Sequence, residues 1–215
     1  GARILMNDAD ALFIGNGHNG SMAWDPTDGR WEYLPFDLGA ACRGGTRGLF
    51  NVSDLGLRRL MSRPIVARAY LRVLEEAANG YWDGRRAKPY LRALQEANRA
   101  NVGTCVSAAS QGARELGRVD EETMRIVTND GHDFETSGST VELAGVAPVA
   151  ITDLFFQRGD GDIEHFEPRF ETATRWHTEF AIEAGLNRFS FFGADADGSL
   201  MGPATISIAV GTRFR

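Results

Sequence analysis

The sequence predicts an α+β chain, in which a helix-rich part with a short β-hairpin (residues 1–122) precedes a small antiparallel β-sandwich (residues 124–215). Two observations support this fold class. Between Leu55 and Leu116 the apolar residues recur at three- and four-residue steps, which is the period of a helix. From Glu122 onward they fall in short alternating runs broken by Gly, Asp and Pro, which is the pattern of strands and turns.

The first expected element is the hairpin. The runs Ser21–Trp24 and Trp31–Phe36 have strand character, and the residues between them, Asp-Pro-Thr-Asp-Gly at 25–29, form a turn signal. We therefore expect these two runs to pair antiparallel.

Polar residues flank this hairpin in the sequence. Asp10, His18 and Asn19 precede it, and Asp37 follows the second run. Oxygen ligands around a short hairpin suit Mg²⁺, and phosphoryl transfer uses one Asp to orient the attacking hydroxyl while an Asn and a later Asp hold metal ions. The other interpretation is a surface hairpin rich in turn-forming residues, and the spacing alone leaves both open.

Helices are expected next along the chain. Ser62 and Pro64 predict the start of a helix that ends at Asn79-Gly80, and further helices are predicted over Lys88–Ala100 and Val106–Leu116. The first of these is marked by apolar residues at three- and four-residue steps; they are Ile65, Val66, Ala69, Tyr70, Val73 and Leu74. Five arginines give this part a basic side, which is either a solvated helix face or a phosphate-binding face; they are Arg58, Arg59, Arg63, Arg68 and Arg72.

The remaining elements are short strands. They are predicted over Arg125–Thr128, Thr140–Leu143, Ile151–Gln157, His177–Ile182, Arg188–Ala194 and Thr205–Val210. Asp195–Ser199 has the beginning of a calcium loop, but Gly202-Pro203 stands where the bidentate Glu belongs, so a hairpin turn is the favoured interpretation. The aromatic residues at 176, 180, 189, 191 and 192 are predicted to form the core of the sandwich rather than a carbohydrate-binding platform.

The order Asn-x-x-Asp, His-Asn and Gly-Arg-Trp-x-Tyr-Leu-Pro-Phe-Asp-Leu resembles the spore-coat CotH kinase family. By this resemblance Asp10 matches the first Asp of the family, His18-Asn19 its His-Asn pair, and Asp37 the Asp of its Pro-Trp-Asp. The resemblance implies the helical C-lobe-like part of a kinase-like fold. In the intact parent Asp10 would orient the acceptor hydroxyl, while Asn19 and Asp37 would hold Mg²⁺ on the phosphates of ATP.

The chain departs from this family in ways that predict an inactive fragment. Gly39 stands where the family has its last Asp, and the single lysine, Lys88, follows the motif. A kinase grips its nucleotide with a Gly-rich loop and a strand Lys, and neither precedes Asp10. The chain opens Gly1-Ala2-Arg3, so we expect it to be an internal piece of a longer protein and not to turn over ATP by itself.

The C-terminal part also has a resemblance. Its Val-Glu-Leu-Ala-Gly-Val-Ala-Pro run at 141–148, with Trp176, Leu186-Asn187 and Gly198 beyond it, looks like the bacterial Ig-like module that often follows CotH-type domains. Two functions are therefore expected. One is a fragment of an ATP-dependent protein kinase; the alternative is a non-catalytic secreted or cell-surface protein whose Ig-like module serves adhesion or carbohydrate binding. Both imply a protein substrate or cell-surface component as partner.

Charge and composition narrow the possible partners. The net charge of −6 gives no basic footprint for nucleic acid, and no apolar run approaches the roughly 20 residues that span a bilayer. Cys42 and Cys105 either pair in an oxidising compartment or remain small buried side chains, since two cysteines define no disulfide framework. A structural zinc site is not expected from two cysteines and four scattered histidines.

Overall fold

The computed structural model describes residues 20–35, 55–79 and 123–211, together with a few isolated positions between 89 and 116. The chain divides into two compact units. The first comprises Gly1–Val66 and Tyr70–Val119, and the second comprises Ala67–Ala69 and Asp120–Arg215.

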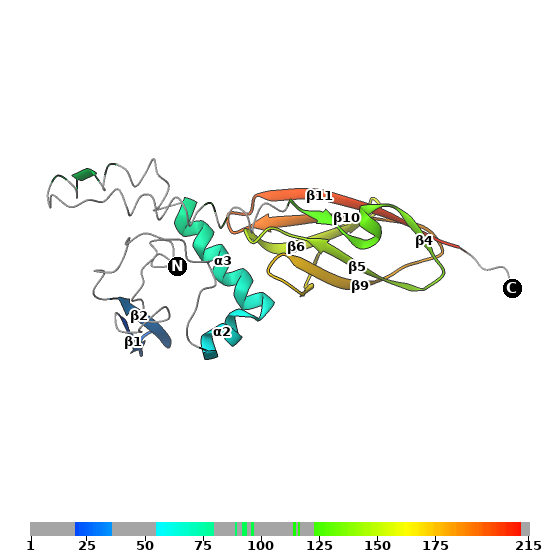
Figure 1. Ribbon diagram of the computed structural model, residues 1–215. Helices are drawn as coiled ribbons and strands as arrows, with labels where there is room; N and C mark the ends of the chain where they lie inside the picture. Colours follow the sequence, from blue (N-terminus) through cyan, green and yellow to red (C-terminus); the bar gives the residue numbers. More distant parts are fainter. Residues whose placement is uncertain are drawn as a thin grey trace. The chain divides into compact units, whose positions relative to one another are not determined.

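The predicted hairpin is present. Strands β1 (Gly20–Asp25) and β2 (Arg30–Pro35) pair antiparallel, with Asp25 opposite Arg30 (Figure 1). At the turn the Asp25 carboxylate accepts a hydrogen bond from the Thr27 amide (2.7 Å), and this bond lowers the pKa of the Asp25 carboxyl. Gly29 completes the turn with a φ of +70°, a conformation that glycine adopts without strain.

Two helices follow, α2 (Leu55–Met61) and α3 (Pro64–Asn79). Helix α3 begins at Pro64 and ends at Asn79 as the sequence predicts, because proline favours the first turn of a helix. Ser62 was predicted to cap this helix, but its hydroxyl donates to the Arg59 carbonyl oxygen in α2 (2.7 Å).

The apolar residues that predict α3 are not all buried. Arg68, Leu71 and Leu74 are buried, whereas Ile65 and Val73 are 69% and 52% exposed. The apolar period therefore identifies the helix but does not define its buried side. Burial also raises the pKa of the Tyr70 phenol. Most of the further helices predicted over 88–100 and 106–116 lies outside the described residues.

The predicted fold class is wrong in its main part. The expectation was a helical C-lobe-like part of a kinase-like fold, yet most described residues belong to a β-sandwich. Among the described residues, α2 and α3 are the only α-helical segments of more than two residues. The physical reason is the location of the core. Almost all buried hydrophobic side chains of the described residues lie between 126 and 208, and α3 adds only Leu71 and Leu74.

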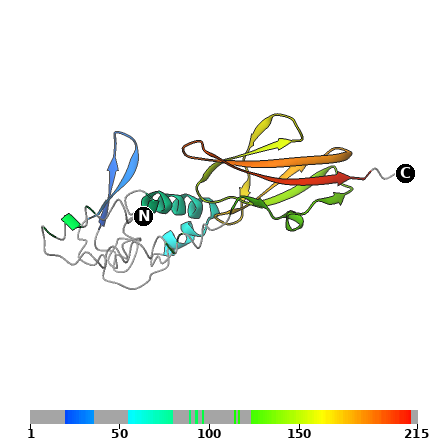
Figure 2. The same ribbon diagram turned by 90° about the horizontal axis from the view of Figure 1, so that it is seen from above.

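The sandwich consists of nine strands in two sheets. One sheet has the order β4-β11-β10-β6-β7 and the other β3-β5-β9-β8, and Figures 1 and 2 show them as two layers. The strands are β3 (Arg125–Ile126), β4 (Phe134–Thr136), β5 (Thr140–Val146), β6 (Ile151–Arg158), β7 (Ile163–Phe166), β8 (Arg169–Phe170), β9 (Arg175–Ala181), β10 (Gly185–Asp195) and β11 (Leu200–Val210).

The strand order is that of an immunoglobulin-like sandwich. If the strands are lettered along the chain, with β4 as A′ and β7 as C′, the four-stranded sheet reads A-B-E-D and the other contains G-F-C. The Ig-like architecture predicted for this part is therefore confirmed at the level of the sandwich. The expectation of a wholly antiparallel sandwich is corrected, because β4 pairs with β11 in parallel, with Phe134 opposite Ile208.

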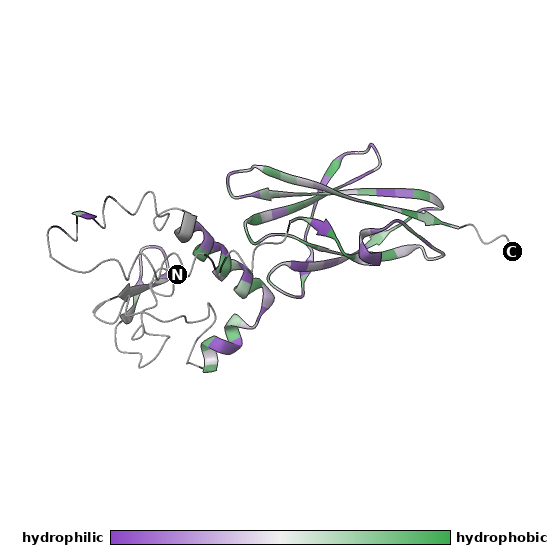
Figure 3. Cartoon of the chain, turned by 45° about the horizontal axis from the view of Figure 1, so that its top comes forward, coloured by the Kyte–Doolittle hydropathy of each residue, from purple (hydrophilic) through white to green (hydrophobic). Residues whose placement is uncertain are grey.

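Alternating side chains from both sheets form the core, as the banded colouring of the strands in Figure 3 illustrates. At its centre is a group of aromatic rings whose centroids lie 5.0–6.3 Å apart; they are Phe156, Phe166, Trp176, Phe180, Phe189 and Phe191. The prediction that the aromatic residues at 176, 180, 189 and 191 belong to the core is confirmed. For Phe192 it is wrong, because this half-buried residue follows Phe191 on the strand and so points to the opposite face of the sheet. The result is a packed scaffold, and the outward side chains of β5 and β9 include Glu142, His177 and Glu179.

Candidate functional site

The residues predicted from the kinase resemblance cannot be placed. Asp10, Asn19 and Asp37 lie outside the described residues, as do Cys42 and Cys105. The described hairpin begins one residue after Asn19, and its first residue, Gly20, is the partner of Pro35. The roles assigned to these residues therefore stay predictions.

A groove of about 580 Å³ lies on the outer face of the four-stranded sheet. Strands β5, β9 and β8 and the residue that follows β7 supply its lining. The lining residues are Thr140, Glu142, Glu167, Arg169, His177, Thr178 and Glu179. All of them are polar or charged, so the groove is chemically distinct from the aromatic core beneath the same sheet.

The pleat of the strands explains why polar side chains gather here. Successive side chains of a strand point to opposite faces, so Leu143 and Trp176 enter the core while Glu142 and His177 face outward. The same alternation holds along β9, where Phe180 is buried and Glu179 faces the groove. The sequence therefore builds the groove from every second residue of two neighbouring strands.

The register of these strands sets an unusual charge arrangement. Glu142 of β5 is directly opposite Glu179 of β9, and like charges in this position destabilise a strand pair. His177 lies diagonally from Glu142, and its Nδ1 is 2.6 Å from the Glu142 Oε1. The imidazole is thus paired with one of the two opposed carboxylates.

A second basic group lies on the far side of the histidine. Arg169 of β8 is the register partner of His177, and Glu167 completes the lining two residues earlier. Three carboxylates thus share the groove with one guanidinium and one imidazole. Such a surface can accept hydrogen bonds from several amino groups at once, and Arg169 and His177 supply donors at its rim.

A metal centre is not visible in this arrangement. In the ranges 20–35, 55–79 and 123–211, no three His, Cys, Asp or Glu side chains are grouped so that they could hold a metal ion. The Asp195–Ser199 segment is the hairpin turn that the sequence favoured. The Asp195 carboxylate accepts hydrogen bonds from the amides of Asp197 (3.0 Å) and Ser199 (2.8 Å), so it is used by the turn itself.

The groove was not predicted from the sequence. Polar or charged residues alternate with apolar ones in Val-Glu-Leu of β5, and His and Glu stand two positions apart in Trp-His-Thr-Glu-Phe of β9. These residues form a groove only because the strand register places Glu142 beside Glu179 and His177. The register between two strands 35 residues apart cannot be predicted from the sequence of either strand alone.

No family model matches the chain, and no curated protein matches it either. Several solved structures are similar to parts of it. Fibronectin(III)-like modules of CbhA from Clostridium thermocellum have 14% identity and a TM-score of 0.31, over 41% of this chain and 95% of that one. The endo-beta-1,4-mannanase from Thermotoga petrophila has 12% identity and a TM-score of 0.34, over 50% and 24%.

The third structure, CopC from Methylosinus trichosporium OB3b, has 15% identity and a TM-score of 0.29, over 43% of this chain and 99% of that one. With TM-scores below 0.5, these similarities indicate no function for this chain. The sandwich is defined by its own strand pairings. Across the described part of the chain, no helix combines the length and the apolar character needed to cross a membrane.

Proposed function

We propose that this chain is a non-catalytic binding module of a secreted or cell-surface protein, and that its groove takes a basic segment of a protein partner. The observation that carries the proposal is the opposed pair Glu142 and Glu179 inside a groove of about 580 Å³. A lysine or arginine side chain placed between two facing carboxylates relieves their repulsion and gains charge-assisted hydrogen bonds.

The charge balance of the groove supports a cationic ligand. Glu142, Glu167 and Glu179 outnumber Arg169, the one permanently charged basic group in the lining. The groove is also built on strands packed against a rigid core, which holds its side chains in place before the ligand arrives. Both features favour a modest but specific affinity.

A carbohydrate ligand has less support. Sugar rings stack on exposed aromatic faces, and most large aromatic side chains of the sandwich are in its core. Phe155 and Phe192, which pair across β6 and β10 outside this core, are half-buried. The described residue with an exposed aromatic ring is Trp24 of the hairpin, at 51% exposure. Phosphoryl transfer from ATP with Mg²⁺, through Asp10, Asn19 and Asp37, stays a prediction for the intact parent and rests on the family resemblance.

Calorimetry with a synthetic peptide of alternating lysine and serine tests the proposal. We expect binding that weakens as salt is added, because the contacts are between exposed charges. The double substitution Glu142→Gln and Glu179→Gln should weaken binding by at least about tenfold, which corresponds to about 1.4 kcal/mol.

The matched control is Glu164→Gln, which removes one exposed carboxylate from β7 in the other sheet. A peptide of alternating glutamate and serine serves as the ligand control. Equal affinity of the groove variant and the Glu164→Gln variant, or equal binding of the two peptides, would remove the basis for a cationic ligand in this groove.

A further inference from the structure

A buried arginine at one end of the sandwich has a different and independent role. Arg68 belongs to the same compact unit as the sandwich, and it is only 7% exposed. Its Nη1 donates to the carbonyl oxygens of Ala147 (2.9 Å) and Ala173 (2.7 Å). Its Nη2 donates to those of Pro148 (2.6 Å) and Ile151 (2.6 Å).

The number of donors equals the number of acceptors. The two terminal nitrogens of a guanidinium carry four N–H groups, and four backbone carbonyl oxygens receive them. The Phe170 ring covers the flat face of the cation, with its centroid 4.4 Å from the Arg68 Cζ. A lysine ammonium has only three donors on a single nitrogen and no flat face, so this geometry selects a guanidinium.

The carbonyl groups are held in position by the sandwich itself. The Ile151 amide donates to the Pro148 carbonyl oxygen (3.2 Å), and the Ala147 amide donates to the Thr174 carbonyl oxygen (2.8 Å). The Thr172 hydroxyl oxygen accepts from the Arg175 amide (2.9 Å) and so orders the neighbouring turn. Both connections that supply the carbonyl groups are thus fixed by bonds that do not involve Arg68.

Four carbonyl dipoles that converge on one point repel each other unless a cation lies between them. We propose that this end of the sandwich is a guanidinium-binding site, formed by the carbonyl groups of Ala147, Pro148, Ile151 and Ala173 with the Phe170 ring. In this chain Arg68 fills it. The site shares no residue with the lining of the groove, and its occupation by a guanidinium is a condition for a stable sandwich.

Chemical rescue tests the proposal on the full chain. Arg68→Ala should lower the melting temperature of the sandwich by roughly 10 °C or more, because four backbone carbonyl groups each lose a hydrogen bond from the guanidinium, three of them in buried contacts. Low millimolar methylguanidinium should then raise the melting temperature of this variant by several degrees. Methylammonium at the same concentration should not, and Arg68→Lys should stay closer to Arg68→Ala than to the natural protein.

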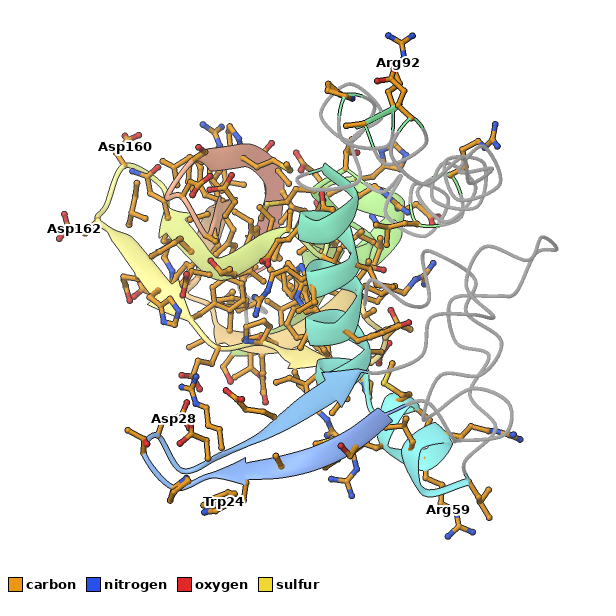
Figure 4. All side chains as sticks on the ribbon, turned by 90° about the vertical axis from the view of Figure 1, so that its left-hand side faces the viewer. Trp24, Asp28, Arg59, Arg92, Asp160 and Asp162 are labelled. Atoms are coloured by element: carbon orange, nitrogen blue, oxygen red, sulfur yellow. The ribbon has the colours of Figure 1, made fainter. Side chains whose placement is uncertain are left out.

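The matched control is Arg59→Ala, which removes an exposed arginine that points away from α2 (Figure 4). Methylguanidinium should leave this variant and the natural protein unchanged or slightly less stable. Natural stability of Arg68→Ala, or an equal response of all variants to methylguanidinium, would overturn the proposal.

A measurement on the natural protein covers the case in which Arg68→Ala does not fold. The Nη protons of Arg68 should give separate, slowly exchanging NMR signals, because hydrogen bonds to four carbonyl groups block rotation of the guanidinium and shield it from water. A single averaged signal that exchanges rapidly with water would overturn the proposal as well.

Discussion

Replacing Gly145 by alanine is expected to destabilise the sandwich strongly. Gly145 of β5 is the register partner of Trp176 of β9, and the indole ring lies across the strand at this point. A Cβ atom at Gly145 would be 2.5 Å from the Trp176 Cζ2, 2.6 Å from its Cε2 and 2.9 Å from the Arg125 carbonyl oxygen. Ordinary contact begins at 3.4 Å, so the ring would have to move by 3.4 − 2.5 = 0.9 Å.

The surroundings leave no room for that movement. Trp176 is 1% exposed, and its ring is packed against Phe166 (5.4 Å between centroids) and Phe191 (5.3 Å). Overpacking of a core costs about 1–3 kcal/mol, and a clash with two rigid groups belongs at the upper end, about 3 kcal/mol. For a domain of this size that corresponds to a fall in melting temperature of about 12–24 °C.

The assay is thermal unfolding followed by near-ultraviolet circular dichroism, which reports the packing of the aromatic core. Gly211→Ala is the matched control, because a Cβ there would meet nothing within 4 Å. Its unfolding free energy should change by less than about 0.5 kcal/mol. If Gly145→Ala is within about 1 kcal/mol of this control, the close packing of Trp176 on β5 is not what makes the glycine necessary.

Three further outcomes are expected. In an NMR titration the midpoint of the Asp25 carboxyl should lie below the ordinary value of 3.8, because the hydrogen bond from the Thr27 amide favours the charged form. The stabilisation of the turn by this carboxylate is present above pH 3.8 and is lost as the pH falls through the lowered pKa. A midpoint at or above 3.8 would contradict the turn geometry. Asn187→Ala should lower the free energy of unfolding in urea by about 1–3 kcal/mol, since the buried Asn187 side chain accepts a hydrogen bond from the Glu183 amide and donates one to the Glu183 carbonyl oxygen. A decrease of less than about 0.5 kcal/mol would refute this role. Calorimetry with Mg·ATP should show no micromolar binding; tight binding that Asp37→Ala abolishes would mean that the chain keeps a working nucleotide site.

Local patterns predicted the long strands but not their full extent. The alternation at 140–143 predicted β5, but the prediction stopped there because glycine at 145 usually indicates a turn. The strand continues to Val146, since Gly145 leaves the space that the Trp176 ring occupies. In the same way the last strand was predicted to begin at Thr205, after Gly202-Pro203. Strand β11 begins at Leu200 and contains both of these residues. A breaker residue in a strand is understood only when the element packed against it is known.

The short edge strands were not predicted for a related reason. Strands β4, β7 and β8 have three, four and two residues, which is too few for a period to be recognised. The parallel pairing of β4 with β11 joins residues more than 70 positions apart. Arg68 was counted among five arginines of a basic helix side, and only the position of four carbonyl groups from distant turns distinguishes it.

Chemical-shift mapping tests most directly whether the groove over β5, β9 and β8 binds a basic segment. The lysine–serine peptide is titrated into isotopically labelled protein, and amide shifts are followed across the sandwich. We expect the largest shifts at Glu142, Arg169, His177 and Glu179, and we expect added salt to reverse them. Shifts that concentrate on β6 and β7 of the other sheet, or no shifts at all, would contradict binding in this groove.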